Sequence, residues 1–285
     1  GPVDDVHLAS EGNGLDLSMP TKLARQLEVF GRVVHALVLR EARTRHGSLR
    51  IGYAWALVEP AIQLGVLWFF YELLGRRVPI NASMPAFLLT GIFPYLAWRS
   101  ASIRGATAIE SNAPLMVHSQ VQPVSIVTAR VLLEMASTLV IFLIFVVTLR
   151  LFANEPLASW FDEPLGLLGA FGAMCLLAFG FALFNAGVAR FVSFWPEVIR
   201  LTARVLFFTS GVFYTMESLP PQAREVILLN PMSHMIEWIR SAALPGFESD
   251  HYSILYVLGW GVWLTFLGLF LDWMLRLSGH TEAAR

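Results

Sequence analysis

The residues best placed to do chemistry in this sequence are three cations that precede two aromatic rings. Arg40, Arg43 and Arg45 lie within six residues, and Tyr53 and Trp55 follow shortly after them. Guanidinium groups are planar donors that suit phosphates and carboxylates. Aromatic rings gather at membrane interfaces and offer flat faces for sugars. The segment is therefore a candidate access site for an anionic, lipid-linked glycan, and a basic anchor that sets membrane orientation is an equally good interpretation.

Ionisable residues inside or beside apolar runs form a second set of candidates, which comprises Glu59, Glu72, Arg99, Glu134, Arg200 and Arg204. Charges in a membrane are costly, so such residues are paired, reach the interface or serve a function. Glu72, Arg200 and Arg204 lie near run ends, where interfacial anchoring is favoured. The other three are candidates for pairing or function, and Glu59 joins the candidate channel residues.

Residues that are missing exclude other chemistry. Lys22 is the only lysine, and it stands in Pro20-Thr21-Lys22-Leu23 without the glycines of a P-loop. The chain therefore cannot hydrolyse ATP by that route, and ATP-driven transport would need a separate ATPase subunit. Seven histidines and one cysteine show no ligand spacing. We expect no catalytic residue, no metal site and no cofactor on this chain, with ATP and Mg²⁺ bound by a partner.

The composition indicates the environment of these residues. Of 285 residues, 56% are hydrophobic and 14% are charged, whereas soluble domains carry about 25% charged residues. This deficit indicates an integral membrane protein. At about 20 residues per span the length allows roughly six spans and no large soluble domain. A formal net charge of −1 argues against nucleic acid as a partner, because no basic excess is available for phosphates.

We therefore predict an all-α integral membrane protein with six transmembrane helices. The apolar runs place them at about residues 54–74, 84–103, 131–149, 164–189, 198–216 and 252–271. The run at 164–189 carries no charge. The runs at 84–103 and 198–216 are the least apolar, because they contain Pro94 with Arg99 and Arg200 with Arg204, respectively.

The segments outside these runs have distinct patterns. Residues 1–19 are polar and predict a disordered cytoplasmic N-terminus, in which Gly1-Pro2 resembles the scar left by a tag protease. Residues 20–50 predict an amphipathic helix, with apolar residues at spacings of four and three. This helix lies in the membrane interface or packs on the protein's own core. Residues 277–285 are expected to form a tail. Arg and Lys bias places both termini in the cytoplasm.

Residues 219–250 contain apolar pieces that are too short to cross a membrane. Val226–Leu229 and Met232–Leu244 are bounded by prolines. They predict short re-entrant helices between the fifth and sixth spans, which only protein or a watery cavity could cover. An ordinary extracellular loop is the alternative, but Trp238 and its apolar neighbours fit poorly with full solvation.

Several motifs resemble those of one known family. They include Leu-Arg-Glu-x-Arg-Thr-Arg-x-Gly at 39–47, Gly-Tyr-x-Trp-Ala-x-x-Glu-Pro at 52–60, and Asn230-Pro231-x-x-His234 with Glu237. In order and spacing, residues 25–275 resemble the membrane subunit of capsular polysaccharide exporters, within the type-2 ABC transporter permeases. The resemblance implies that 20–46 is a gate helix. It also implies that Asn230, Pro231, His234 and Glu237 belong to a periplasmic re-entrant gate.

The resemblance further implies a coupling helix that inserts into the ATPase, formed by Ile109, Glu110, Asn112, Leu115 and Met116. Here the sequence departs from the family pattern, because Ala113-Pro114 follows Asn112. We therefore expect the helix to begin at these residues, since proline is tolerated in a first turn.

The function implied by the resemblance is export of a lipid-anchored acidic polysaccharide across the inner membrane of a Gram-negative bacterium. A homodimer would form the channel, in which Trp238 is a further candidate residue. The implied partners are an ATPase subunit, a periplasmic co-polymerase, an outer-membrane exporter and membrane lipid. The alternatives are a permease for O-antigen, teichoic acid or a drug-like lipid, and a membrane-embedded glycolipid-modifying enzyme. A secondary transporter is disfavoured, because no inverted repeat is evident.

Overall fold

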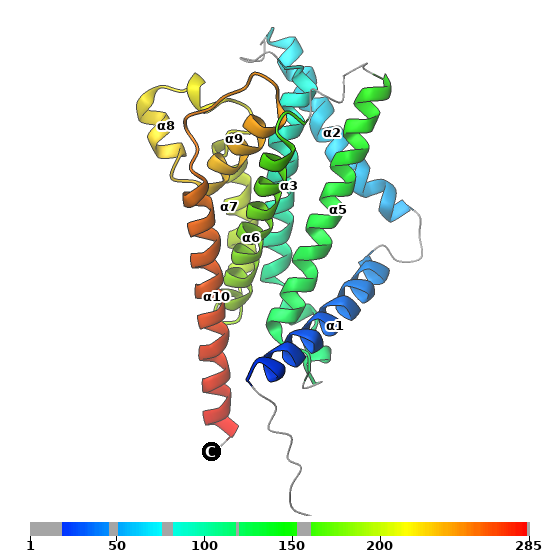
Figure 1. Ribbon diagram of the computed structural model, residues 1–285, viewed down its shortest axis with the longest axis vertical. Coiled ribbons are helices and arrows are strands. Elements are labelled where there is room, and N and C mark those ends of the chain that lie inside the picture. Colours follow the sequence, from blue (N-terminus) through cyan, green and yellow to red (C-terminus); the bar gives the residue numbers. More distant parts are fainter. Residues whose placement is uncertain (1–18, 46–50, 76–81, 118–119, 153–160, 284–285) are drawn as a thin grey trace, which may run out of the picture.

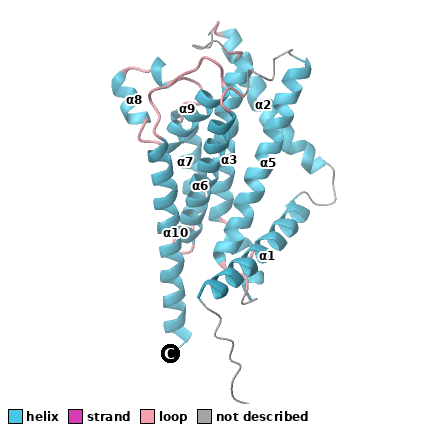
Figure 2. Ribbon diagram, in the orientation of Figure 1, coloured by secondary structure: helices cyan, strands magenta, loops and turns pink. Residues whose placement is uncertain are grey.

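The protein is a bundle of helices in the part of the chain that the structure, a computed structural model, describes: residues 19–45, 51–75, 82–117, 120–152 and 161–283 (Figures 1 and 2). The helices in chain order are α1 (Met19–Arg45), α2 (Ile51–Leu73), α3 (Met84–Ala106), α4 (Ala108–Ser111), η1 (Ala113–Val117), α5 (Pro123–Phe152), α6 (Pro164–Ala189), α7 (Trp195–Thr209), η3 (Met216–Ser218), α8 (Pro221–Ile227), α9 (Pro231–Ala243) and α10 (Ile254–Ala283). Disorder was expected for residues 1–19. Residues 1–18 lie outside the described residues, and Met19 begins α1.

Among the residues that the structure describes, three helices are long and apolar enough to cross a membrane. They run over Pro123–Leu151 in α5, Pro164–Ala189 in α6 and Ile254–Leu277 in α10. The prediction of an all-helical membrane protein is therefore supported. The remaining expected spans overlap with α2, α3 and α7, and their crossing of the membrane stays a prediction.

The fifth predicted span was wrong at both ends. We expected residues 198–216, whereas α7 has 15 residues and runs from Trp195 to Thr209. Pro196 fits its first turn, and the chain turns immediately after the helix at Gly211, where φ is +78°. At 1.5 Å per residue α7 is about 22 Å long, which is shorter than the hydrocarbon core of about 30 Å.

The last helix is longer than expected. We placed its end near residue 271 and a tail from residue 277, but α10 continues to Ala283. Asp272 and Arg276 form an ion pair one turn apart, with an Oδ2–Nη2 distance of 2.8 Å, and such pairs support a helix. Arg190, in the turn before α7, also contacts Asp272 at 2.9 Å. This end of α10 is therefore held to the bundle.

Close packing at glycines joins α3, α6 and α10. A Cβ added to Gly105 of α3 would lie 2.5 Å from the Cα atom of Ala182 in α6, and one added to Gly180 would lie 2.6 Å from the carbonyl oxygen of Gly261 in α10. Such approaches are possible only without a side chain, and they are typical of membrane helix packing. These three helices form the centre of the bundle.

The helix α1 lies across one end of the bundle, near the end of α10, whereas α8 and α9 lie at the opposite end (Figure 1). Of its apolar residues, Val34 is buried, while Leu23 and Leu27 are more than half exposed. The burial of Val34 supports packing of this helix on the protein's own core, whereas its position in the membrane interface stays a prediction. The C-terminal half of α1 packs on α5, and the N-terminal half presents leucines outward.

Candidate functional site

The end of α1 is bound to the segment predicted to couple the chain to an ATPase. The guanidinium of Arg40 donates a hydrogen bond to Oδ1 of Asn112, with an Nη1–Oδ1 distance of 3.2 Å. Asn112 is buried, and its amide nitrogen donates to the carbonyl oxygen of Ala108 at 2.9 Å. Arg40 was predicted as an access residue for cargo. Its position also gives it a structural contact, which sequence reasoning missed.

A second contact beside this one joins the same segments through α5. Arg130 pairs with Glu41 of α1 at 3.2 Å between Nε and Oε1, and both side chains are mostly buried. Two other nitrogens of Arg130 donate to the hydroxyl of Ser111 at 2.9 Å and to the carbonyl oxygen of Arg104 at 3.2 Å. Arg130 therefore connects α1, α3 and α4.

The predicted coupling helix is divided into two short pieces. α4 ends at Ser111, and η1 begins at Ala113, with Pro114 in its first turn. Ile109 is buried, Glu110 is exposed, and Leu115 and Met116 are half-buried. Val117 is 85% exposed, so an apolar side chain stands outside the bundle at this end.

The other predicted access and channel residues are placed as follows. Arg43 and Glu59 are exposed, whereas the side chains of Arg45, Tyr53 and Trp55 lie outside the described residues. Trp238 is buried, stacks on Tyr252 at a centroid distance of 6.4 Å and lies against Gly169 of α6. Contact between Trp238 and a cargo would therefore require movement of α9.

Of the intramembrane charges, Glu134 is paired. Its carboxylate lies 3.0 Å from Nε of Arg104 and accepts a hydrogen bond from Ser100 at 2.6 Å. Glu59 and Arg204 are exposed and make no ion pair with the described part of the chain. Within the described part of the chain, Arg200 forms an ion pair with Glu197 of its own helix, at 2.8 Å.

The region predicted to be re-entrant contains two short helices, α8 and α9, and its entry into the membrane stays a prediction. Asn230 caps α9, because its Oδ1 accepts from the amide of Met232 at 3.0 Å, and Pro231 fills the first helical position. The side chain of Asn230 also donates to the hydroxyl of Ser210 at 2.8 Å. This residue therefore joins α9 to the end of α7.

His234 joins α8, α9 and α10. Its Nδ1 accepts a hydrogen bond from the amide of Ser253 at 3.0 Å, so the neutral ring carries its proton on Nε2, which lies 2.8 Å from the carbonyl oxygen of Leu228. The ring packs on Tyr256. Burial lowers the pKa of His234, partly offset by its bond to the Leu228 carbonyl.

Sequence reasoning missed Arg240, which is fully buried in α9. Its guanidinium donates to the carbonyl oxygens of Gly211 at 2.6 Å, Val212 at 2.8 Å and Tyr214 at 2.9 Å. It also lies 3.9 Å above the ring of Phe87, a favourable cation–π distance. The only sequence signal was an arginine three residues after Glu237 in the short 232–244 segment.

Glu237 completes this buried group. Its Oε1 lies 3.9 Å from Nη1 of Arg240 and accepts from the amide of Met216 at 3.1 Å. Burial lowers the pKa of Arg240 to about 10, and the charge of Glu237 opposes that shift. Arg240 therefore stays charged at neutral pH. The pair fixes the turn after α7, residues 210–216, to α9.

No group of three or more His, Cys, Asp or Glu residues is close enough to hold a metal ion among the residues described. What the geometry provides is a set of apolar helices, a fixed turn at one end and an exposed surface of short helices at the other. These features are those of an all-helical integral membrane protein.

The comparison with known proteins gives the family. The chain belongs to the ABC-2 type transporter family, whose model matches residues 32–244. It is 31% identical over 242 residues to the polysialic acid transport protein KpsM of Escherichia coli, covering 85% of this chain and 93% of KpsM. It is 30% identical over 223 residues to the capsule polysaccharide export inner-membrane protein BexB of Haemophilus influenzae, covering 77% of this chain and 82% of BexB. The O-antigen export system permease protein RfbA of Klebsiella pneumoniae is 24% identical over 255 residues, covering 88% of this chain and 95% of RfbA.

Proposed function

We propose that this chain is the transmembrane subunit of an ATP-driven exporter that moves lipid-linked acidic capsular polysaccharide across the bacterial inner membrane. The observation that carries this proposal is the similarity, over 77% or more of the chain, to proteins named for polysialic acid transport and capsule polysaccharide export. ATP and Mg²⁺ bind a separate ATPase subunit. A periplasmic co-polymerase and an outer-membrane exporter continue the path.

In this proposal six helices cross the membrane, and both termini are cytoplasmic. The arrangement of the ends supports it, because α1 and the end of α10 lie together and the predicted re-entrant helices lie opposite (Figure 1). The Arg-rich face of α1 then lies in the cytoplasm, in agreement with the positive-inside rule.

The channel is proposed to lie between two copies of the chain, with α7 on its wall. One face of α7 is exposed and combines charged with apolar side chains: Glu197, Arg200, Leu201, Arg204, Val205 and Phe208. Charged residues of membrane helices face protein or water rather than lipid. The exposed Glu59 of α2 supports the same conclusion. A second copy and an aqueous path would provide that environment.

Cargo is proposed to approach along α1. Arg40, Arg43 and Arg45 attract the anionic end, and Tyr53 and Trp55 contact sugar rings. Arg40 also binds Asn112, so its replacement would affect both cargo contact and the position of α1. Replacement of Arg43 tests cargo contact alone. Arg43→Gln should lower export while leaving α1 in place, whereas Arg25→Gln, also exposed on α1, should have little effect.

The ATPase is proposed to dock on α4 and η1. Val117→Asp places a charge on the exposed apolar tip of this segment and should strongly reduce co-purification of the ATPase subunit. Val226→Asp is the matched control, because Val226 is also exposed, at 67%, but belongs to α8 at the opposite end. Equal retention of the ATPase by both variants would place its docking surface elsewhere.

Gene deletion with complementation tests the function as a whole. Deletion should remove surface capsule and cause lipid-linked acidic polysaccharide to accumulate inside the cell, and the wild-type gene should reverse both effects. Accumulation of O-antigen or teichoic acid instead would assign another cargo. Conversion of a lipid-linked sugar by the isolated chain would indicate an enzyme and overturn the transport proposal.

A further inference from the structure

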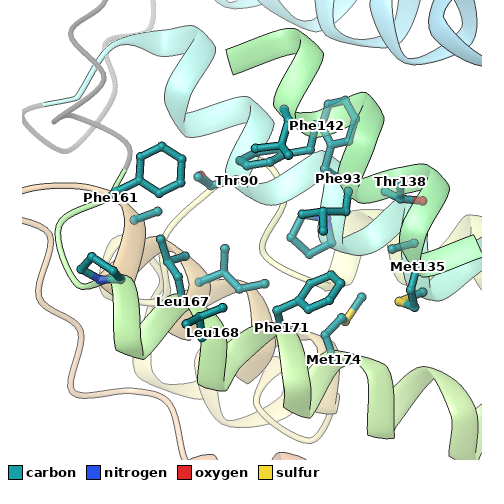
Figure 3. Close-up of a pocket in the computed structure, with 17 residues that line it drawn as sticks. Thr90, Phe93, Met135, Thr138, Phe142, Phe161, Leu167, Leu168, Phe171 and Met174 are labelled. Atoms are coloured by element: carbon teal, nitrogen blue, oxygen red, sulfur yellow. The ribbon is translucent and has the colours of Figure 1, made fainter. Parts of the chain in front are cut away.

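A cavity of about 420 Å³ lies between α3, α5, α6 and α9. Figure 3 shows Thr138 and Phe142 of α5 on one side, Leu167 and Phe171 of α6 on the other, and Phe93 of α3 between them. None of the residues that line it belongs to the predicted access, coupling or re-entrant gate residues. The cavity is therefore distinct from the predicted sites described above.

The lining is almost wholly apolar. Of 17 lining residues, Thr90 and Thr138 are the only ones with a polar side chain. The Thr90 hydroxyl is already bonded, because it lies 3.0 Å from the carbonyl oxygens of Ala86 and Phe87 in its own helix. Apolar cavities stay dry, and one of about 150 Å³ holds benzene. This cavity is nearly three times larger and suits a longer hydrocarbon.

The extent of the cavity corresponds to one leaflet of a bilayer. Along α6 its lining runs from Pro164, at the first position of the helix, to Met174. Ten residues of helix rise about 15 Å, and the hydrocarbon core of a bilayer is about 30 Å thick. The cavity therefore extends from the α8–α9 end of the bundle to about mid-membrane.

The cavity is open toward the surrounding lipid. Leu139 and Leu143 on α5 and Leu168 on α6 line it and are also exposed, at 38%, 43% and 69%, respectively. α5 and α6 are both apolar enough to cross the membrane, so these leucines face lipid tails. A chain in that leaflet can enter sideways between the two helices without crossing a polar surface.

We propose that this cavity binds one acyl chain of a membrane phospholipid from the leaflet at the α8–α9 end. Ile239 and Ala243 of α9 form part of the wall, and α9 also carries Arg240, which fixes the turn after α7. The bound chain therefore supports the helix on which that turn depends. The proposal requires a membrane but does not depend on the identity of the cargo.

The test is photolabelling of the full chain, with its partner subunits, in nanodiscs that contain phosphatidylethanolamine with a diazirine on one acyl chain. Labels should map to cavity residues such as Met135 and Phe171. Thr138→Phe fills the space and should lower this labelling at least fivefold. Thr148→Phe is the control, because Thr148 lies on the same helix outside the lining.

A second variant guards against misfolding of the first. Leu168→Trp acts at the exposed rim and should also lower labelling of Met135 and Phe171. Labels that spread evenly over exposed residues such as Leu151 and Leu165, or that persist in both filled variants, would overturn the proposal. Loss of phosphatidylethanolamine labelling when purified lipid-linked polysaccharide is added would assign the cavity to the cargo's lipid anchor and also overturn it.

Discussion

The side chain of Arg40 on α1 donates a hydrogen bond to the side chain of Asn112, which lies 72 residues away between α4 and η1. Beside it, Arg130 of α5 bonds to both Glu41 and Ser111. The amphipathic helix and the proposed ATPase-docking segment are thus connected by polar contacts in two places. Displacement of one segment would strain the contacts with the other.

Arg130→Gln should loosen this connection. The substitution removes a mostly buried ion pair and charged hydrogen bonds, which are worth about 1.5–3 kcal/mol each. We expect a lower unfolding temperature in detergent and faster tryptic cleavage within α1. Arg32→Gln is the control, because Arg32 and Glu28 form an exposed pair at 3.7 Å, worth about 0.5 kcal/mol or less. Equal effects of the two substitutions would contradict a special role for Arg130.

Arg240→Gln should be among the most destabilising substitutions in the chain. It leaves three carbonyl oxygens and the buried Glu237 without their cationic partner, and removing one member of a buried pair costs about 3–5 kcal/mol. Arg240→Lys should be intermediate, because an ammonium group cannot reproduce the planar fork. Thermal unfolding of the purified protein measures both. Arg200→Gln breaks an exposed pair and should change the unfolding temperature little. A lower unfolding temperature for Arg240→Lys than for Arg240→Gln would contradict the hydrogen-bond geometry described for Arg240.

Gly105→Ala should separate α3 from α6. The new Cβ would lie 2.5 Å from a backbone atom of Ala182, and overpacking of this kind typically costs about 1–3 kcal/mol. Gly172→Ala on α6 is the matched control, because a Cβ there meets nothing within 4 Å. Monodispersity and thermal stability in detergent should fall only for Gly105→Ala. A stable Gly105→Ala protein would show that the two helices are less closely packed.

Acidification should weaken the α8–α10 region through His234. Its pKa is lowered in the folded protein, so folding favours the neutral ring, whose Nδ1 accepts from Ser253. Stability is then fully present above the ordinary histidine pKa of about 6.5 and declines as the pH falls below it. The slope is at most about 1.4 kcal/mol per pH unit for one proton.

Unfolding temperatures between pH 7.5 and 5.5 measure this dependence. His234→Gln, which cannot take up the proton, should flatten the decline. His35→Gln is the control, since His35 is exposed on α1 and its replacement should leave the decline unchanged. An identical pH dependence for His234→Gln and the wild type would assign the effect to other groups.

Much of the fold could be predicted because membrane helices depend mainly on local composition. The uncharged run from Pro164 to Ala189 gave the bounds of α6 correctly, and the prolines around 231 and 245 marked the limits of α9. The end of α7 could not be predicted in this way. Residues 210–216 are apolar enough to be taken for a continuation of the helix. They form a turn instead, because Arg240 and Glu237 bind their backbone.

The contacts of the candidate site were the hardest part to predict. The spacing of Arg40, Arg43 and Arg45 indicates a cationic surface, but it carries no information about Asn112, whose position depends on the packing of α1 against α5. Arg240 could not be identified from the sequence, because nothing local indicates that three carbonyl groups surround it. Tertiary contacts between distant segments decide both cases.

The glycine contacts of α3, α6 and α10 divide the protein into a stiff part and an adjustable part. A Cβ added to these glycines would lie 2.5–2.8 Å from backbone atoms of the neighbouring helix. The helices are therefore too close to slide past one another, and we expect the three to move as one body. Among the described glycines, none on α2 or α7 makes such a close contact with a neighbouring helix. In a transport cycle we would then expect α2 and α7 to move relative to α3, α6 and α10. Spectroscopic probes placed on α2 or α7 should report motion that probes on α6 do not.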